Sequence, residues 1–309
     1  MATAPRIPSV GFIGLGVMGE PMAGHLAKAG HRLALFDARP RRAARLAARF
    51  GAAASAPHSP AEVARASDIV VTMVPDGQVV RELVTQPGGL LEGFAEGQLL
   101  LDTSSSEPWL TRETGARLAE RGVAMVDAPV SGAQWGAQAA ELVFMVGGAA
   151  RDVARVRPLL DAMGKSVFHL GALGSGHAMK CLNNLVTAVN FLAVAEGLAI
   201  GTKQGLDPAV MTDVLNASTG MSWVSQTHVR QRILSRRFDD PFKLGLMVKD
   251  IGIASDLARE SQLPVPVSGL VQQLWRAAAQ GTPADASVSE IARWVERLTG
   301  VEIASPASA

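Results

Sequence analysis

The sequence GALGSGHAMKCLNNLVTAVNFLAVAEGLAIGTKQG, residues 171–205, decides how the rest of the chain must be arranged. It opens with glycines, which are poor helix formers, and continues as an almost uninterrupted apolar run. The pattern predicts one helix, residues 175–204, about 40 Å long. Because a helix that is apolar all round needs neighbours on every side, we expect it to lie between two domains.

Three polar residues interrupt this run near its start. Lys180, Asn183 and Asn184 fall in the first turns, and Lys180 and Asn184 stand four residues apart on one face. An ammonium near the buried end of an apolar helix costs free energy unless it has a partner, which suggests chemistry at that end. The alternative is an ordinary lysine whose stem packs on the helix and whose charge reaches water.

The composition excludes several classes of protein. The chain has 309 residues, of which 48% are hydrophobic and 18% charged, with a formal net charge of +1. That length is enough for two domains with real cores, and the charge does not favour binding to nucleic acid or to a membrane surface. Charged and amide side chains within residues 175–204 also argue against a membrane span.

The single cysteine, Cys181, excludes an intramolecular disulfide and fits a reducing compartment, so we expect a cytoplasmic protein. It follows Lys180 directly and therefore points about 100° away from it, so we interpret it as a packed apolar residue and not as a nucleophile. His and Cys residues do not occur in pairs at metal-ligand spacing, and we expect no metal site.

The first half of the chain carries a glycine motif between a strand pattern and a helix pattern. An apolar run from Val10 leads into Gly14-x-Gly16-x-x-Gly19, a helical pattern up to Gly30, and a second strand, Leu33 to Phe36. Such a motif predicts a dinucleotide site, in which the first glycine makes the turn, the second lets the backbone approach the pyrophosphate and the third lets helix and strand pack closely. The residues expected at the cofactor here are Gly14, Leu15, Gly16, Val17, Met18 and Gly19.

Asp37, at the end of the second strand, bears on the choice of cofactor. A carboxylate there accepts the ribose 2′-hydroxyl and repels a 2′-phosphate, which favours NAD over NADP. Against this, Arg39, Arg41 and Arg42 follow at once and could attract that phosphate.

The alternation of strand and helix patterns continues to about residue 160. Strand-like runs are Ile69 to Val74, Leu99 to Leu101 and Ala124 to Val126, with helical stretches between them. This predicts an α/β Rossmann domain with a doubly wound, mostly parallel sheet, and ligands at the carboxyl ends of its strands.

The carboxyl ends of the predicted strands hold Val74-Pro75, Ser104-Ser105 and Ser131-Gly132. The last pair, in DAPVSG, could also be a plain turn, although a serine hydroxyl beside backbone N–H groups suits a small carboxylate.

After the long helix only helical patterns follow, so we expect an all-α C-terminal domain over residues 173–309, after a dinucleotide-binding domain over residues 1–172. One of these patterns places Lys249 on an amphipathic helix, where a solvated lysine is the simplest interpretation. The expected helices are Asp207 to Ala217, Trp223 to Leu234, Phe242 to Glu260, Val267 to Gln280 and Ser287 to Leu298.

Four motifs in this order resemble the β-hydroxyacid dehydrogenase family, the group of 3-hydroxyisobutyrate dehydrogenase and tartronate semialdehyde reductase. The motifs are Gly14-Leu-Gly-Val-Met-Gly19, Asp127-Ala-Pro-Val-Ser-Gly132, Gly174-x-Gly176-x-x-x-Lys180-x-x-Asn183-Asn184 and Lys249-Asp250. The resemblance covers nearly the whole chain. It implies NAD(P)-linked interconversion of a small 3-hydroxy acid and its semialdehyde, and a homodimer or homotetramer.

Carried over residue by residue, the resemblance implies that Lys180 is the general acid/base and that Asn184 holds the substrate or orients the lysine. Ser131, Gly132, Ala133 and Trp223 would bind or line the substrate, a small carboxylate. Val74, Pro75, Ser105 and Lys249 would contact the cofactor.

This chain departs from the family pattern next to the serine motif. Ala133 replaces a second glycine, Trp135 stands where a small residue is usual, and Ala140-Glu141 replaces a Gly-Asn pair. These changes would reshape the pocket, so the sequence assigns a class of substrate and no particular molecule.

Two other functions remain open at this point. Imine reductases resemble this chain in layout, but generally do not keep a lysine at the position of Lys180. A non-catalytic nucleotide-binding protein could use the same scaffold, although the intact Lys180 and Asn184 argue against it.

Overall fold

The computed structural model describes residues 7–305. The chain divides into two units between Lys180 and Cys181, inside the long helix α9 (Ser175–Lys203). The prediction of one helix over residues 175–204 is therefore confirmed to within one residue. The domain boundary between residues 172 and 173 stays a prediction.

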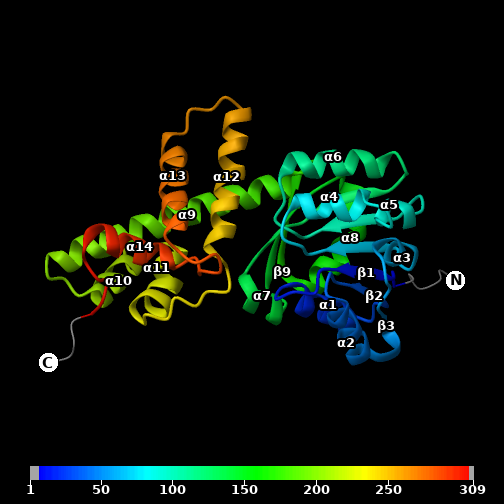
Figure 1. The fold of residues 1–309 in the computed structure, drawn as a ribbon, viewed down its shortest axis with the longest axis horizontal. Helices are drawn as coiled ribbons and strands as arrows, with labels where there is room; N and C mark the ends of the chain where they lie inside the picture. The colour runs from blue at the N-terminus through cyan, green and yellow to red at the C-terminus, as the bar shows by residue number, and fades with distance from the viewer. Residues whose placement is uncertain (1–6, 306–309) are drawn as a thin grey trace. The chain divides into compact units, whose positions relative to one another are not determined.

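The first unit is built on a nine-stranded sheet in the order β3-β2-β1-β4-β5-β6-β8-β7, with β9 paired to β8 (Figure 1). Strands β1 to β6 pair in parallel, which confirms the predicted mostly parallel sheet, although β3 was not predicted. Strand β8 runs antiparallel to β6 and β7. The strands are β1 (Val10–Ile13), β2 (Leu33–Phe36), β3 (Ala54–Ser55), β4 (Ile69–Thr72), β5 (Leu99–Asp102), β6 (Ala124–Asp127), β7 (Val130–Ser131), β8 (Leu142–Gly147) and β9 (Gly164–Gly171).

Helices cover both faces of this sheet because successive strand residues point to opposite sides. Phe12 and Leu101 face a core with α1, α2 and α8, whereas Ile13 and Leu100 face a core with α3, α4, α5 and α6. The helices of the unit are α1 (Gly19–Lys28), α2 (Pro40–Phe50), α3 (Pro60–Arg65), α4 (Gly77–Thr85), α5 (Leu90–Gly93), α6 (Pro108–Ala119), α7 (Ala133–Ala139) and α8 (Ala150–Met163), with a 3₁₀ turn at Gly51–Ala53.

The second unit is helical, as predicted, within its described residues. Its core forms around α9, where Phe191 meets the rings of His228 and Trp275 edge-on, with centroids 4.9 and 6.1 Å away. The Trp275 indole N–H also donates to the carbonyl of Ala188. The remaining helices are α10 (Pro208–Asn216), α11 (Trp223–His228) with a π-helical continuation at Val229–Leu234, α12 (Leu244–Glu260), α13 (Pro266–Gln280) and α14 (Glu290–Thr299).

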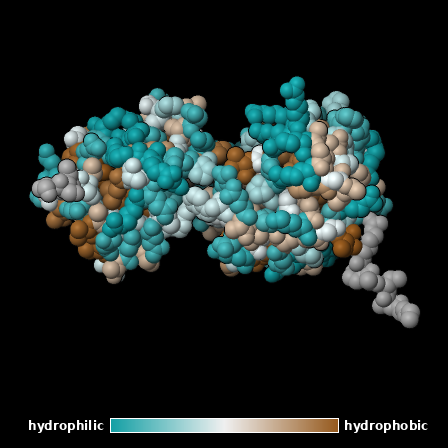
Figure 2. Space-filling model, turned by 90° about the horizontal axis from the view of Figure 1, so that it is seen from below, coloured by the Kyte–Doolittle hydropathy of each residue, from teal (hydrophilic) through white to brown (hydrophobic). Residues whose placement is uncertain are grey.

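By length and composition alone, α9 is apolar enough to cross a membrane. The core helices of globular proteins have the same length and composition. Here the apolar composition has another explanation, since Ala188, Leu192, Ala195 and Leu198 pack in the core of the helical unit. Figure 2 shows one face of the molecule, on which hydrophobic patches lie among the hydrophilic residues of the helical unit.

Two of the departures from the family pattern have a backbone conformation that favours glycine. Ala133, at the start of α7, has φ +52°, and Ala140, which ends it, has φ +58°. A side chain in this left-handed region costs about 1–2 kcal/mol, because Cβ approaches the backbone carbonyl. The glycines usual at these positions would relieve that strain.

We expect Ala140→Gly to stabilise the chain by about 0.5–1 kcal/mol. The relief of left-handed strain exceeds the roughly 0.4–1 kcal/mol that glycine loses through a freer unfolded chain. Urea unfolding of both proteins measures the difference. Ala139→Gly, one residue earlier and still inside α7, is the matched control and should destabilise. Equal effects of the two substitutions would contradict the argument.

Candidate active site

The glycine turn between β1 and α1 fits a dinucleotide. Gly14 has φ +96°, and a Cβ there would collide with the backbone oxygen of Met73. A Cβ on Gly19 would collide with the backbone oxygen of Gly14, whereas one on Gly16 would meet nothing within 4 Å. Two glycines thus let the turn close, and the third leaves open space beside the backbone, where a pyrophosphate could approach.

Asp37 holds this turn in place. Its Oδ2 accepts the backbone N–H of Leu15 at 2.8 Å and its Oδ1 accepts that of Arg39 at 2.8 Å. The guanidinium of Arg42 lies 3.8 Å from Oδ2. Leu15 is buried, whereas Val17, two residues later in the same turn, is exposed. Asp37 therefore shapes the glycine turn as well as standing at the end of β2.

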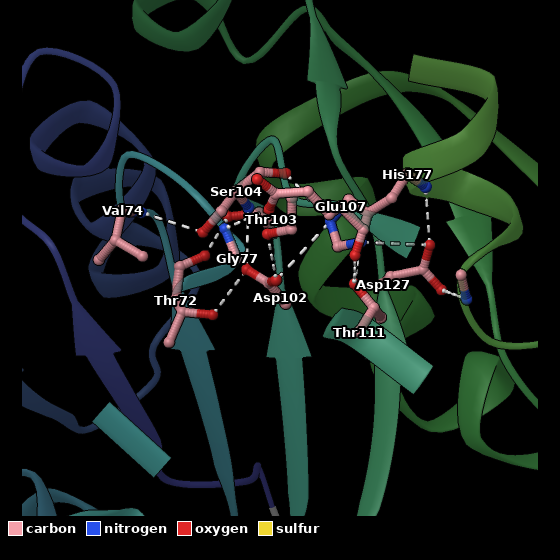
Figure 3. A network of polar contacts seen from close by, with 12 residues as sticks. Thr72, Val74, Gly77, Asp102, Thr103, Ser104, Glu107, Thr111, Asp127 and His177 are labelled. Atoms are coloured by element: carbon pink, nitrogen blue, oxygen red, sulfur yellow. Dashed lines mark hydrogen bonds and ion pairs between the residues drawn. The ribbon is translucent and has the colours of Figure 1, made fainter. Parts of the chain in front are cut away.

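Three polar side chains stand in register across β4, β5 and β6, on the face of the sheet covered by α6 (Figure 3). They are Thr72, Asp102 and Asp127, all fully buried. The Thr72 hydroxyl donates to Oδ1 of Asp102 at 2.9 Å, and the Ser106 hydroxyl donates to Oδ2 at 3.0 Å. These bonds satisfy a carboxylate that would otherwise be costly to bury.

Two of the predicted cofactor segments are linked through Ser104. Its hydroxyl oxygen accepts the backbone N–H of Val74 at 3.0 Å, and its own N–H donates to Asp102. The loop after β4, with Val74 and Pro75, is therefore joined to the loop after β5, with Ser105.

Asp127 fixes the start of α9. Its Oδ1 accepts the backbone N–H of Gly174 at 2.7 Å, and its Oδ2 accepts that of His177 at 2.8 Å. A Cβ on Gly176 would lie 2.8 Å from Oδ2, so only glycine allows the helix to approach this closely. The Gly174-x-Gly176 motif thus brings the helix onto the carboxylate. Lys180 follows one turn later and is only 8% exposed.

Within the helical unit, Asn184 and Lys249 meet at one carboxylate, that of Asp250. The Asn184 amide nitrogen donates to Oδ2 of Asp250 at 2.6 Å, and the Lys249 ammonium lies 3.4 Å from Oδ1. The Asn184 oxygen accepts from the amide of Asn183 at 3.1 Å. Asp250 is 1% exposed, and its charge fixes which way the Asn184 amide faces.

The remaining predicted site residues lie at the starts of two helices. Ser131 pairs with Val143 of β8, and Gly132, with φ +128°, leads into α7. Trp223 begins α11 and is half exposed, with its ring 4.5 Å from that of His228. Among residues 7–305, His, Cys, Asp and Glu side chains do not gather in any group of three or more that could hold a metal ion.

Comparison with known proteins identifies the family of this chain. Residues 9–171 match the model of the NAD binding domain of 6-phosphogluconate dehydrogenase, and residues 174–295 match the NAD-binding domain of NADP-dependent 3-hydroxyisobutyrate dehydrogenase. The chain belongs to the β-hydroxyacid dehydrogenase family. The resemblance seen in its sequence is confirmed, and with it a nicotinamide cofactor.

Three relatives illustrate the family. The 2-(hydroxymethyl)glutarate dehydrogenase of Eubacterium barkeri is 35% identical over 95% of this chain and 97% of its own. The NAD-dependent L-serine dehydrogenase of Pseudomonas aeruginosa is 38% identical over 86% and 91%. The solved structure of Mycobacterium tuberculosis 3-hydroxyisobutyrate dehydrogenase with L-serine has a TM-score of 0.85 at 33% identity, covering 94% and 99%.

Several residues of these networks were not predicted from the sequence. Asp127 and Asp250 belong to two of the quoted motifs, and Asp102 directly follows the predicted strand Leu99 to Leu101, but none of the three was given a role. A signal for the first two was present, because both aspartates end predicted neighbouring strands of a parallel sheet. His177 had no such signal, since its partners lie far away in the chain.

Cys181 is buried in the helical unit, as its interpretation as a packed residue requires. Burial, reinforced by the negative charge of Asp250, raises the pKa of its thiol to about 12 from an ordinary value of 9.0. The thiolate, which is the reactive form, is therefore disfavoured in the folded protein.

This pKa predicts a loss of stability in alkali. The folded chain keeps the thiol proton more tightly than the unfolded chain, so the contribution of this group is complete below pH 9 and is lost as pH rises towards 12. We expect the free energy of unfolding to fall by up to about 1.4 kcal/mol per pH unit from this group. Urea unfolding of wild type and Cys181→Ala between pH 8 and 10.5 isolates it. A difference between the two proteins that does not change with pH would contradict the prediction.

Proposed function

We propose that this chain is an NAD(P)-dependent oxidoreductase that interconverts a small 3-hydroxy acid and its semialdehyde, with Lys180 as general acid/base. One observation carries the proposal: Lys180 is buried one turn after the start of α9, which Asp127 holds against the carboxyl edge of the sheet. Lysines are rarely buried without a task or a partner. Ligands of doubly wound sheets bind at this edge.

The proposed chemistry needs one proton carrier and one hydride acceptor. Bound nicotinamide supplies the hydride acceptor in oxidation and the hydride donor in reduction. The Lys180 amine takes the hydroxyl proton as the alcohol is oxidised, and the ammonium returns it to the developing alkoxide in reduction. Asn184 stands one turn further along the same face of α9. Because Asp250 holds its amide, Asn184 can hold the substrate or orient the lysine.

The substrate carboxylate is assigned to the turn between β7 and α7. Ser131 offers a hydroxyl, and Gly132 and Ala133 offer backbone N–H groups, which together suit a carboxylate. The positive φ of Gly132 and Ala133 sets the direction of those N–H groups. Trp223, half exposed at the start of α11, is assigned to the substrate side as well.

The names of the relatives suggest the substrate class. 2-(Hydroxymethyl)glutarate, L-serine and 3-hydroxyisobutyrate share a primary alcohol two bonds from a carboxylate, and differ in the substituent between them. We propose that the substrate of this chain carries the same fragment. Ala133 and the partly exposed Trp135 distinguish its pocket from the usual family pattern, and we assign the choice of substituent to them.

We also propose that the enzyme prefers NAD to NADP. Asp37 lies at the end of β2 with its carboxylate beside the glycine turn. A negative charge at this point favours a ribose hydroxyl and repels a phosphate. Arg42, which could attract that phosphate, already lies 3.8 Å from the same carboxylate.

The preference predicts that Asp37→Ala lowers the ratio of kcat/KM for NAD to that for NADP by at least about tenfold, the value of one lost charge-assisted hydrogen bond. Because Asp37 also holds the Leu15 N–H, the affinity for both cofactors should fall as well. Asp37→Asn is the control: it keeps an oxygen for Leu15, so it should recover affinity without recovering the ratio. A wild-type enzyme that already prefers NADP would contradict the assignment.

The central prediction concerns Lys180. We expect Lys180→Met to lower kcat by about 10²–10⁴-fold, the usual contribution of a general acid/base, with the affinity for NAD changed less than threefold. Stopped-flow turnover and fluorescence titration of NAD measure the two quantities. Lys203→Met, at the exposed end of the same helix, should behave as wild type. Near-normal turnover by Lys180→Met would remove the mechanism.

The substrate is best found by screening both cofactors against 3-hydroxyisobutyrate, 3-hydroxypropionate, L-serine, glycerate, threonate and sulfonate analogues. Cyclic imines with NADPH form a second arm. Turnover of imines alone would establish an imine reductase instead, and stoichiometric NAD binding without any turnover would support a non-catalytic protein.

Finally, we propose a cytoplasmic homodimer or homotetramer. Large apolar side chains are exposed on the helical unit, among them Ile200 (65%), Val210 (59%) and Val214 (58%). Exposed apolar residues in such numbers are typical of surfaces that pair with another chain. Sedimentation velocity of the preparation used in the screen measures the state, and a monomer would contradict it.

A further inference from the structure

The ring of His177 connects three segments of the first unit (Figure 3). Its side chain is fully buried, with Nε2 lying 3.1 Å from the backbone oxygen of Ser104 and Nδ1 2.8 Å from the hydroxyl of Thr111 in α6. A carbonyl oxygen can only accept, so Nε2 must carry a hydrogen and donate it. The backbone N–H of the same residue donates to Asp127.

The ring connects the start of α9 to the loop at Ser104, and both segments have roles in the proposed reaction. His177 stands three residues before Lys180 on α9. Ser104 precedes Ser105 and holds the N–H of Val74, and both of those residues are assigned to the nicotinamide side. One imidazole thus joins the lysine-bearing helix to the loops that would face the reacting ring of the cofactor.

We propose that His177 is a positioning residue, which sets the position of Lys180 relative to the nicotinamide side through the hydrogen bond from its Nε2 to Ser104. The proposal rests on the function proposed for Lys180 above. It adds a residue that touches neither the substrate nor the reacting atoms.

The need for a second attachment follows from geometry. The hydrogen bonds that Asp127 accepts hold the first turn of α9 at one carboxylate. A helix held at one point can still tilt about that point. The ring bond to Ser104 lies on a different segment and restrains that tilt. Proton and hydride transfer require the reacting groups to be aligned closely, and a misplacement of about 1 Å can lower the rate about a hundredfold.

The surroundings of the ring make it a rigid support. Nε2 lies 3.6 Å from Oδ2 of Asp102, and Nδ1 lies 3.7 Å from Oδ2 of Asp127. Both carboxylates are fully buried. The imidazole therefore fills the space between two neighbouring strand ends, and its nitrogen atoms face the two carboxylates. An apolar side chain in the same place would leave buried polar groups without hydrogen-bond partners.

Two substitutions separate positioning from general stability. The side-chain nitrogen of glutamine reaches about as far as Nε2, whereas that of asparagine reaches only as far as Nδ1. His177→Gln can therefore still donate to Ser104, and His177→Asn cannot. We expect kcat of His177→Gln to stay within about threefold of wild type and that of His177→Asn to fall about 10–100-fold. KM for the hydroxy acid and for NAD should change less than threefold in both.

His31→Asn is the matched control. His31 is also buried in the first unit, and its Nδ1 also contacts a backbone oxygen, that of Pro8 at 2.9 Å. It precedes β2 and so stands at the opposite edge of the sheet from the carboxyl ends. This variant should lose thermal stability without losing kcat. Equal losses of kcat in His177→Gln and His177→Asn, or a His177→Asn that loses only stability, would overturn the proposal.

A second measurement does not depend on turnover. If the ring holds the Ser104 loop, the amides of Val74 and of residues 104–106 should exchange hydrogen at least about tenfold faster in His177→Asn than in His177→Gln, with NAD present. Unchanged exchange in His177→Asn overturns the positioning role. A wild-type enzyme inactive on every hydroxy acid, with this exchange pattern intact, refutes the proposed function and leaves the hydrogen-bonded support standing.

Discussion

The hydrogen bonds from the start of α9 to the buried carboxylate of Asp127 are the interaction on which the rest of the site depends. Burying a carboxylate costs free energy unless several hydrogen-bond donors surround it. Two backbone N–H groups at the start of α9 are such donors. The close approach is possible only because residue 176 lacks a side chain. The aspartate thereby attaches a long helix to the sheet edge where nucleotides bind, and places Lys180 one turn beyond that attachment.

Two polar residues of α9 that we propose to act in one reaction are supported by different carboxylates. Lys180 belongs to the first unit and Asn184 to the second, yet both stand on one face of the same continuous helix. Each is supported from its own side, the start of the helix by Asp127 and the Asn184 amide by Asp250.

The residues that we propose to handle the alcohol and those that we propose to choose the substrate lie in different parts of the chain. The lysine, the asparagine and the glycine turn follow the family pattern, whereas the turn at Ala133 does not. The left-handed backbone is kept at Ala133 and Ala140 although neither is glycine. Retaining a strained conformation indicates that the direction of these backbone groups matters more than the stability it costs.

The sequence by itself determined those parts of the protein that are local in the chain. Periodicity placed the first strands, the long helix and the helical second half, and the glycine spacing placed the nucleotide turn, because each of these is encoded within one short segment. Strands β3, β7, β8 and β9 were not expected, and β8 pairs antiparallel with β6. Only the tertiary structure decided that Thr72, Asp102 and Asp127 stand in register, that His177 reaches Ser104, and that Asp250 holds Asn184. These partners are between 25 and 73 residues apart in the sequence. Contacts over such distances depend on the pairing of strands and the packing of helices, which no local pattern encodes.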